Sequence, residues 1–341
     1  MRFGTVGYTL AVMTALSPFR VVAATLLAAP LVLAPATTLA APAEHSAGTA
    51  AAAVAAPTAL SARATARTTV RVGSYNVHKD DRRMPWTAKR RDRVARQILG
   101  NRFDVVALQE THGMFNFPSL RRKVAHRFAA TARCGRVKGT EIRDTRTRIL
   151  YDRSRYSGSR TISGRILLDR THAPPSEYAC YQLITQKATG AKFLVVSAHL
   201  VTGTGRAKDL KRYQETRNLI NDALAVRRAH GATWPIVWAG DYNSSGSRRY
   251  TFDAPKRAMR QLVGARDAYA VARTRKHGSY NSANQLRRVP WRTHHHVDHV
   301  YVSPGIGVSA FRVVVRLSGR LYKTPFASDH NPIRATLRIP Y

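Results

Sequence analysis

Apolar segments that end in short polar clusters recur along this sequence, and they limit the folds that it can adopt. The clusters that end or follow such segments are Ser74-Tyr75-Asn76, Gln109-Glu110-Thr111, His199, Gly240-Asp241-Tyr242-Asn243 and Val297-Asp298-His299. A sixth cluster, Ser328-Asp329-His330-Asn331, precedes the last apolar segment. Short apolar segments of this kind are typical of buried strands. If the strands lie side by side, their ends meet at one edge, and we expect the clusters to share a cleft.

Helical patterns alternate with these segments. Arg206–Ala229 predicts a long basic helix, Trp86–Leu99 a shorter one, and Phe117–Ala132 a third. Strands are expected at residues 70–75, 103–108, 148–151, 162–168, 178–186, 192–200, 235–239, 297–302, 308–315 and 333–339. Many strands with helices inserted between them predict a layered α/β architecture.

The first 69 residues differ in composition from the rest of the chain. Residues 1–41 combine a basic start, a long apolar stretch and a small-residue end, which is typical of a signal peptide. Residues 42–69 are rich in Ala, Thr and Pro and predict a disordered linker, so the folded domain is expected at residues 70–341. We expect a secreted protein, with a retained membrane anchor as the alternative. The mature protein is expected to be a monomer without stable membrane association.

The chain is strongly basic, with 56 Lys and Arg against 19 Asp and Glu and a formal net charge of +37. Such a protein attracts polyanions, namely nucleic acid, acidic polysaccharide or anionic membranes. An Arg-rich proteome is the alternative explanation of the charge. Basic runs such as Arg90-Arg91, Arg121-Arg122-Lys123 and Arg248-Arg249 are expected either to follow a nucleic-acid backbone or to be solvated surface.

The acidic and amide side chains of the clusters suit a hard divalent cation, because Mg²⁺, Mn²⁺ and Ca²⁺ prefer oxygen ligands. Glu110 and Asp329 are the best candidate ligands. Asn76 is expected either to bind the ion or to orient Glu110. The alternatives are a surface-loop carboxylate for Glu110 and a turn residue for Asp329.

Other residues of the clusters suit hydrolysis of a phosphodiester, which needs an activated water and neutralised phosphate charge. Asp241 is a candidate base, and Asn243 a candidate hydrogen-bond donor to the phosphate. His199 and His330 can donate to phosphate oxygens, and Asp298 can orient His330 and keep it protonated. The alternatives are a turn for the Asp-Tyr-Asn segment, structural histidines, and an ion pair between Asp298 and an arginine.

Several other enzyme classes lack their motifs here. The sequence has no Gly-x-Ser-x-Gly elbow, no P-loop and no Gly-x-Gly-x-x-Gly. Its two cysteines, Cys134 and Cys180, lack the spacing of a zinc site; export permits a disulfide between them without showing that they meet. Consecutive residues of a strand point in different directions, so the run His294-His295-His296 is not expected to form a metal site.

Six ordered motifs resemble those of the endonuclease/exonuclease/phosphatase superfamily, which includes deoxyribonuclease I, AP endonucleases and neutral sphingomyelinases. They are RVGSYNV (71–77), DVVALQET (104–111), FLVVSAHL (193–200), IVWAGDYN (236–243), VDHVYVS (297–303) and SDHNPI (328–333). The resemblance implies a four-layer α/β-sandwich, in which helices flank two packed mixed β-sheets. It also implies a divalent metal, foremost Mg²⁺, with Mn²⁺ or Ca²⁺ as alternatives.

The same resemblance implies a role for each matching residue. Asn76 and Glu110 match residues on the metal side, and Asp329 and His330 match the closing Asp-His motif, with Asp329 assigned to the metal. The remaining matches are His199 for phosphate binding, Asp241 and Asn243 for the base and its phosphate-orienting partner, and Asp298 for support of His330.

Three positions depart from the pattern. His78 stands where AP endonucleases carry a metal-side Asp, so a repair-type AP enzyme is not expected. Ala198 replaces the usual Thr before His199. Tyr178-Ala179-Cys180 occupies the region in which an Arg is often found.

The sequence therefore predicts a secreted metal-dependent phosphodiesterase, foremost a nuclease whose substrate is DNA or RNA. A phospholipid phosphodiesterase of the sphingomyelinase type, or another phosphoesterase, is the first alternative. Its membrane-inserting element would have to be Pro290-Trp291, which is a weak candidate. A catalytically inactive nucleic-acid-binding protein is the second alternative.

Overall fold

The computed structural model describes residues 66–111, 116–131, 133–134, 146–171, 178–246 and 253–341. The predicted signal peptide and nearly all of the predicted linker lie outside these residues, as does the basic run Arg248-Arg249. Strand β1 (Arg67–Asn76) begins inside the segment 42–69 that was predicted to be a linker. The reason is that Thr68 is buried and its neighbours pair with the last strand of the chain.

Seven strands of the described chain form the first sheet. In spatial order they are β10 (Thr274–Lys276), β12 (Gly307–Val313), β15 (Ile333–Pro340), β1, β2 (Val105–Gln109), β4 (Arg148–Asp152) and β3 (Phe128–Ala130). Strands β1 and β2 are parallel, whereas β15 and β4 run antiparallel to the strands beside them. The parallel pair ends with Asn76 opposite Gln109, directly before Glu110.

Six strands of the described chain form the second sheet. In spatial order they are β5 (Tyr156–Leu167), β6 (Tyr178–Gln186), β7 (Lys192–His199), β8 (Ile236–Asp241), β11 (Asp298–Val302) and β9 (Arg266–Asp267). Strands β7 and β8 are parallel, and β11 is antiparallel to β8. A separate hairpin consists of β13 (Leu317–Ser318) and β14 (Leu321–Tyr322).

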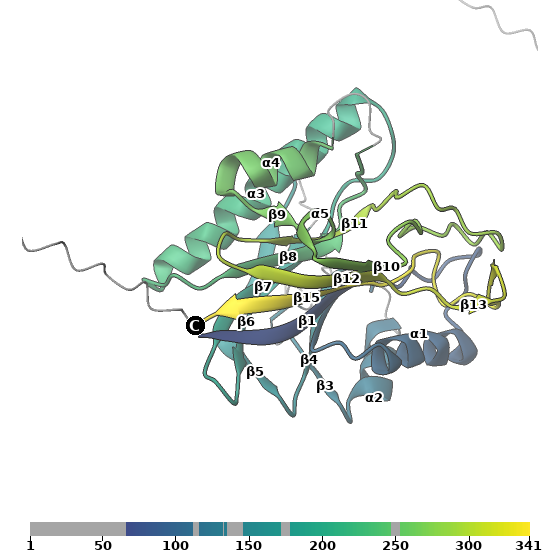
Figure 1. The fold of residues 1–341 in the computed structure, drawn as a ribbon, viewed down its shortest axis with the longest axis horizontal. Helices are drawn as coiled ribbons and strands as arrows, with labels where there is room; N and C mark the ends of the chain where they lie inside the picture. Colours follow the sequence, from purple (N-terminus) through teal and green to yellow (C-terminus); the bar gives the residue numbers. More distant parts are fainter. Residues whose placement is uncertain (1–65, 112–115, 132, 135–145, 172–177, 247–252) are drawn as a thin grey trace, which may run out of the picture. The chain divides into compact units, whose positions relative to one another are not determined.

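Helices cover the outer face of each sheet (Figure 1). Helices α1 (Ala88–Gly100) and α2 (Asn116–Val124) pack on the first sheet, and α3 (Arg206–Ala229) and α4 (Ala254–Val263) pack on the second. A short helix, α5 (Ala268–Val271), follows β9.

Strand residues alternate between the layers. Val105 and Ala107 of β2 face the core between the two sheets, whereas Val106 and Leu108 pack against the helices. This two-residue period is that of a strand buried on both faces. The four-layer α/β-sandwich predicted from the sequence is confirmed.

One helix prediction was wrong. The segment 117–132 is not one helix, because α2 ends at Val124 and the chain then forms β3. Phe128 of β3 is buried and pairs with Asp152 of β4. A helix that continues past Val124 and a short strand after Val124 are hard to distinguish in the sequence, because either one would bury Phe128.

Gly240 allows β8 to lie against β7. A Cβ atom at this position would overlap the backbone oxygen of Ala198, which cannot move without breaking the parallel pairing. We predict that Gly240→Ala lowers the free energy of unfolding by roughly 1–3 kcal/mol, the usual cost of overpacking. Urea unfolding measures this. Gly100→Ala is the control, because nothing lies within 4 Å of its added Cβ; equal losses in both variants would contradict the explanation.

A buried ion pair lies behind the end of β8. The Nδ1 atom of His299 on β11 is 3.0 Å from Asp267 Oδ2, and its Nε2 is 2.9 Å from the carbonyl oxygen of Ser244. The ring stacks on Tyr301 and meets Tyr242 edge-on. Burial lowers the pKa of His299, but Asp267 and, further away, Asp253 more than offset this and raise it to about 9.

Stability should therefore depend on pH through His299. A histidine whose folded pKa exceeds its unfolded value of about 6.5 stabilises the fold fully below pH 6.5. This contribution is lost as the pH rises through about 9. We predict that wild-type protein loses more free energy of unfolding than His299→Gln between pH 6.5 and 9.5, by on the order of 3 kcal/mol. If the free energy of unfolding, measured in urea, changed equally with pH in both proteins, the charge of His299 beside Asp267 would contribute nothing to stability, which would contradict the prediction.

Candidate active site

Three predicted residues lie in one row across the second sheet. His199 ends β7, Asp241 ends the parallel strand β8, and Asp298 begins the antiparallel strand β11. The register pairs His199 with Asp241 and Asp241 with Asp298. Strand pairing alone thus brings together residues that are far apart in the sequence.

The amide of Asn76 joins this row to the first sheet. Its Nδ2 atom donates to Glu110 Oε1 at 2.9 Å and to Asp241 Oδ2 at 3.0 Å. Asn76 is buried, and its carbonyl Oδ1 accepts the backbone N–H of His78 at 3.0 Å. The other oxygen of Glu110 accepts the backbone N–H of Lys79 at 2.9 Å. The expected convergence of the strand ends is therefore present.

His330 contacts the row from the segment before β15. Its Nδ1 is 2.8 Å from Asp298 Oδ2, and its Nε2 is 3.7 Å from Asp241 Oδ2. A backbone bridge to Ala283 fixes the segment. Burial lowers the pKa of His330, but the carboxylates of Asp298 and Asp241 more than offset this and raise it well above its usual value. The ring is therefore a cation at neutral pH.

Asp241 lies deep in the site, with a side chain that is 2% exposed. Its Oδ1 accepts the backbone N–H of Asn243 at 2.9 Å. Burial and the nearby charge of Asp298 raise the pKa of Asp241, against the opposite effect of His330 and His199. A raised pKa makes this carboxylate a stronger base than an exposed aspartate.

His199 presents a donor without a partner. Its Nε2 lies 3.6 Å from Asp241 Oδ2 and 3.9 Å from Glu110 Oε1, and is buried without a hydrogen bond to any described residue. A buried donor without a partner is costly, and a ligand that accepts its hydrogen bond would remove this cost. Burial raises the pKa of Glu110, but His199 and Asn76 more than offset this and lower it below its usual value.

Asn243 is placed differently. Its backbone contacts Asp241, whereas its side-chain Nδ2 donates to the carbonyl oxygen of Leu200 at 2.9 Å. It thus joins the segments that follow β7 and β8. Asn243, Glu110 and His78 have positive φ angles of 48°, 56° and 58°. Such backbone conformations are unfavourable for residues with a side chain and concentrate at functional sites.

His78, which sequence analysis noted only as a departure, holds Asp329. Its Nδ1 is 3.0 Å from Asp329 Oδ1, and its Nε2 is 3.1 Å from Asp81 Oδ2. Burial lowers the pKa of His78, but Asp329 and Asp81 more than offset this and raise it. Burial raises the pKa of Asp329, and His78 and His330 reverse this and hold it well below its usual range. The Asp81 carboxylate three residues after His78 was the available sequence signal.

Arg90 holds the surrounding loop and was misinterpreted as part of an exposed basic run. Its side chain is buried, and residues with buried guanidinium groups cannot follow a nucleic-acid backbone. It donates to five carbonyl oxygens, those of Val77, His78, Lys79, Met84 and Ala327. Ser328 adds a second anchor, because its Oγ donates to the backbone oxygen of Asn76 at 2.7 Å.

Two groups of side chains are candidates for holding a metal. Ligand atoms of Asp241, Asp298 and His330 lie within 4.8 Å of one another. In this group the Nδ1 atom of His330 is already bound to Asp298. The oxygen donors of Glu110 and Asp329 are anionic, and with Asn76 they match the donor chemistry that Mg²⁺ prefers. The residues present thus fit a hard divalent ion.

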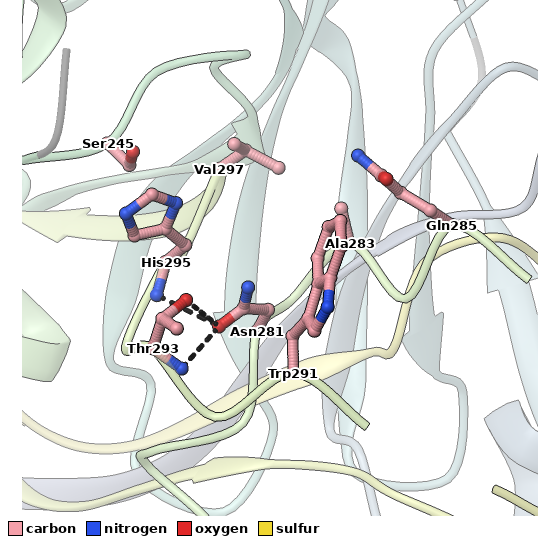
Figure 2. Close-up of a pocket in the computed structure, with 8 residues that line it drawn as sticks. All are labelled: Ser245, Asn281, Ala283, Gln285, Trp291, Thr293, His295 and Val297. Carbon is pink, nitrogen blue, oxygen red and sulfur yellow. Dashed lines mark hydrogen bonds between the residues drawn. The ribbon is translucent and has the colours of Figure 1, made fainter. Parts of the chain in front are cut away.

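A cavity of about 510 Å³ (Figure 2) is lined by Ala283, which pairs with His330, and by Val297, which directly precedes Asp298. It is lined by Ser245, Asn281, Ala283, Gln285, Trp291, Thr293, His295 and Val297. Asn281 Oδ1 accepts the backbone N–H groups of Thr293 and His295 at 3.0 and 3.2 Å, which fixes this loop. Trp291 is 39% exposed, and the Arg287 guanidinium lies 4.2 Å from its ring centre. Sequence analysis noted Trp291 only as part of a weak candidate for a membrane-inserting element.

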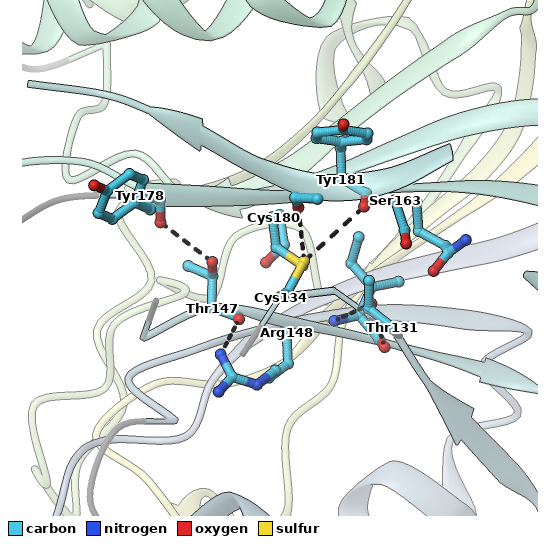
Figure 3. Close-up of a disulfide and its surroundings, with 12 residues drawn as sticks. Thr131, Cys134, Thr147, Arg148, Ser163, Tyr178, Cys180 and Tyr181 are labelled. Carbon is cyan, nitrogen blue, oxygen red and sulfur yellow. Dashed lines mark hydrogen bonds between the residues drawn. A yellow bond between two sulfur atoms is a disulfide. The ribbon is translucent and has the colours of Figure 1, made fainter. Parts of the chain in front are cut away.

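The disulfide Cys134–Cys180 lies on the strand next to that of His199 (Figure 3). Cys180 belongs to β6 and pairs with Ser197, two residues before His199 in β7. The sequence left this bond open. It ties Cys134 to β6 of the second sheet.

Comparisons with known proteins agree with this geometry. The pattern of the Endonuclease/Exonuclease/phosphatase family matches residues 73–330. None of the curated proteins matches the sequence.

Solved structures of this fold have varied names. A mannosyl-6-phosphatase from Bacteroides thetaiotaomicron has 19% identity and a TM-score of 0.62, covering 79% of this chain and 99% of that chain. D. rerio TDP2 complexed with single strand DNA product has 19% identity and a TM-score of 0.55, with the same coverage. Sphingomyelinase C from Streptomyces griseocarneus has 18% identity and a TM-score of 0.57, also with 79% and 99% coverage.

At these identities the structural likeness shows the fold alone. The family pattern spans most of the chain and includes every strand end described above. The chain belongs to the endonuclease/exonuclease/phosphatase family, whose members are metal-dependent phosphoester hydrolases.

Proposed function

We propose that the protein is a secreted nuclease that hydrolyses phosphodiester bonds of DNA or RNA with a divalent ion, foremost Mg²⁺. The observation that carries this proposal is the unpaired Nε2 of His199, which faces Asp241 in a chain of net charge +37. A phosphate at this position satisfies the donor, and a basic protein attracts a polyanion that contains many phosphates.

Each side chain then has a chemical task. Asp241 accepts the proton of the attacking water, and His199 and the cationic His330 donate hydrogen bonds to phosphate oxygens. Asp298 keeps His330 charged and oriented. The Asn76 amide keeps Glu110 and Asp241 apart and in place.

Glu110, Asp329 and Asn76 would hold the ion. When bound, the ion supplies positive charge that stabilises negative charge developing on the phosphate and the leaving oxygen. Asn243 orients Asp241 through its backbone N–H at 2.9 Å. Its predicted side-chain contact with phosphate requires release from the carbonyl oxygen of Leu200.

A phospholipid phosphodiesterase remains the second candidate, because one structural neighbour is a sphingomyelinase C. Among the described residues, no helix has the length and apolar character needed to cross a membrane. Trp291 stacks with Arg287 and lines the cavity beside the site, so we assign it to the substrate and not to a membrane.

Nicking of supercoiled plasmid by the purified mature protein tests the proposal. With Mg²⁺ we expect nicking that EDTA abolishes. Glu110→Ala, Asp241→Ala and His330→Ala should each reduce the rate at least roughly 100-fold, the usual effect of removing a catalytic acid, base or charge donor. Asp222→Ala is the control, because this carboxylate pairs with Arg170 on the surface of α3. Hydrolysis of choline-lipid vesicles without nicking would instead favour the phospholipid substrate.

Trp291 should contribute to binding of a nucleotide next to the cleaved bond. Stacking of a base on an aromatic ring contributes about 1–3 kcal/mol. We predict that Trp291→Ala lowers kcat/KM for oligonucleotides about tenfold, mainly through KM, and leaves a small phosphodiester unaffected. Steady-state kinetics measures both. The control is Val289→Ala in the same loop, whose side chain is 62% exposed; an equal effect there would argue against a specific stacking site.

A further inference from the structure

A second cavity, which we call the basic cavity, lies between α1 and the β13–β14 hairpin. It has a volume of about 330 Å³ and is lined by Lys89, Asp92, Arg93, Arg96, Arg316, Lys323, Thr324 and Pro325. The backbone N–H of Lys323 donates to the carbonyl oxygen of Arg316 at 2.8 Å, which brings the two basic residues side by side at the base of the hairpin. Five of the eight lining residues are therefore cations: three belong to α1, and two flank the hairpin.

The charge of the basic cavity is not neutralised from within. Asp92, its single carboxylate, is bound by Arg91 at 3.0 Å and Lys123 at 3.5 Å, neither of which lines the cavity. Within the described part of the chain, the side chains of Lys89, Arg96, Arg316 and Lys323 make no hydrogen bond or ion pair. Their charges are thus available to an external anion.

Arg93 is held in place inside this group. Its Nε donates to the carbonyl oxygen of Phe326 at 3.0 Å. Burial and the charges of Arg96 and Arg316 lower the pKa of Arg93. Like charges held close together repel, and an anion between them relieves the repulsion.

The basic cavity lies next to the segment that leads into the active site. Arg316, Lys323 and Pro325 also line a narrow cavity whose other lining residues include Ser328 and His330. The carbonyl groups of Phe326 and Ala327, which directly precede Ser328, are held by Arg93 and Arg90 of α1. Arg93, which lines the basic cavity, thus contacts the segment that leads to Ser328 and His330.

We propose that the basic cavity binds a backbone phosphate of a nucleic-acid strand, away from the phosphate that is cleaved. This inference rests on the proposed nuclease function, because it assigns the substrate strand a second contact with the enzyme. Phosphate is the shared chemistry of a strand and of free inorganic phosphate. The strand is preferred because the basic cavity adjoins the site at which a strand would be cleaved.

Binding tests the proposal without turnover. The mature Asp241→Ala protein in EDTA is titrated against a labelled single-stranded oligonucleotide, with fluorescence anisotropy recorded over a range of salt concentrations. Adding Arg96→Ala and Lys323→Ala should weaken binding roughly 3- to 10-fold at low salt. The slope of log affinity against log salt should fall by roughly 0.7 for each phosphate that the variant no longer binds.

A matched pair controls for net charge. Lys192→Ala and Arg228→Ala remove the same two charges from the start of β7 and the end of α3, at the opposite end of both elements from the site. An equal effect of the control pair and of the cavity pair, Arg96→Ala with Lys323→Ala, would overturn the proposal, as would no effect of the cavity pair.

A titration with inorganic phosphate at constant ionic strength distinguishes a nucleic-acid strand from free phosphate as the ligand of the cavity. Binding of inorganic phosphate that the Arg96→Ala and Lys323→Ala variant loses, together with an unchanged affinity of that variant for the oligonucleotide, would assign the cavity to free phosphate and overturn the proposal of a strand.

Kinetics of the enzyme with Asp241 intact separates this inference from the proposed function. The cavity pair should raise KM for the oligonucleotide roughly 3- to 10-fold and leave hydrolysis of bis(p-nitrophenyl) phosphate, which has one phosphate, unchanged. An equal loss on both substrates would overturn the proposal, since the variants would then disturb the site itself. If the wild type cleaves neither substrate, the nuclease function fails, whereas the binding experiment still decides whether the basic cavity holds a phosphate.

Discussion

One amide nitrogen connects the two halves of the active site. Asn76 Nδ2 donates to Glu110, which follows the first sheet, and to Asp241, which ends a strand of the second. Without it, the partly buried carboxylate of Glu110 and the buried carboxylate of Asp241 would face each other across the seam between the sheets, where charge repulsion is strong. The amide thus allows one carboxylate to stay anionic on the metal side and the other to act as a base. The rest of the site depends on this separation.

Buried charges elsewhere stabilise the same edge. Arg90 satisfies the carbonyl groups of the loop that carries His78, and His78 in turn holds Asp329. On the other side, His299 supports the segment after β8 from behind. These contacts hold the side chains of the active site in position before a substrate binds, so substrate binding does not have to arrange them. Pre-organisation of this kind explains why so many charges are buried in one small region.

The strand ends could be predicted from sequence because apolar segments and polar clusters alternate at the spacing of strands. The limits of α3 were predicted correctly, but its two faces were not, because Leu210 is exposed whereas Arg212 and Glu215 are buried. Short elements such as β9, β13 and β14 carry too few residues for a pattern, and α4 was not foreseen. Burial of Arg90 was missed because a guanidinium is placed inside only by carbonyl groups that tertiary structure supplies. The basic cavity was missed because its cations come from segments more than 200 residues apart, as from Arg96 to Lys323.

In this account Glu110 binds the metal and Asp241 acts as the base. Anomalous diffraction from crystals soaked in Mn²⁺ tests this assignment most directly. We predict a peak at Glu110, next to Asp329 and Asn76, at oxygen-ligand distances of about 2.2 Å. Asp298 should keep its contact with His330 in the same crystal. A single peak among Asp241, Asp298 and His330 would contradict the account, because Asp241 could not then serve as a free base and His330 could not remain a cation.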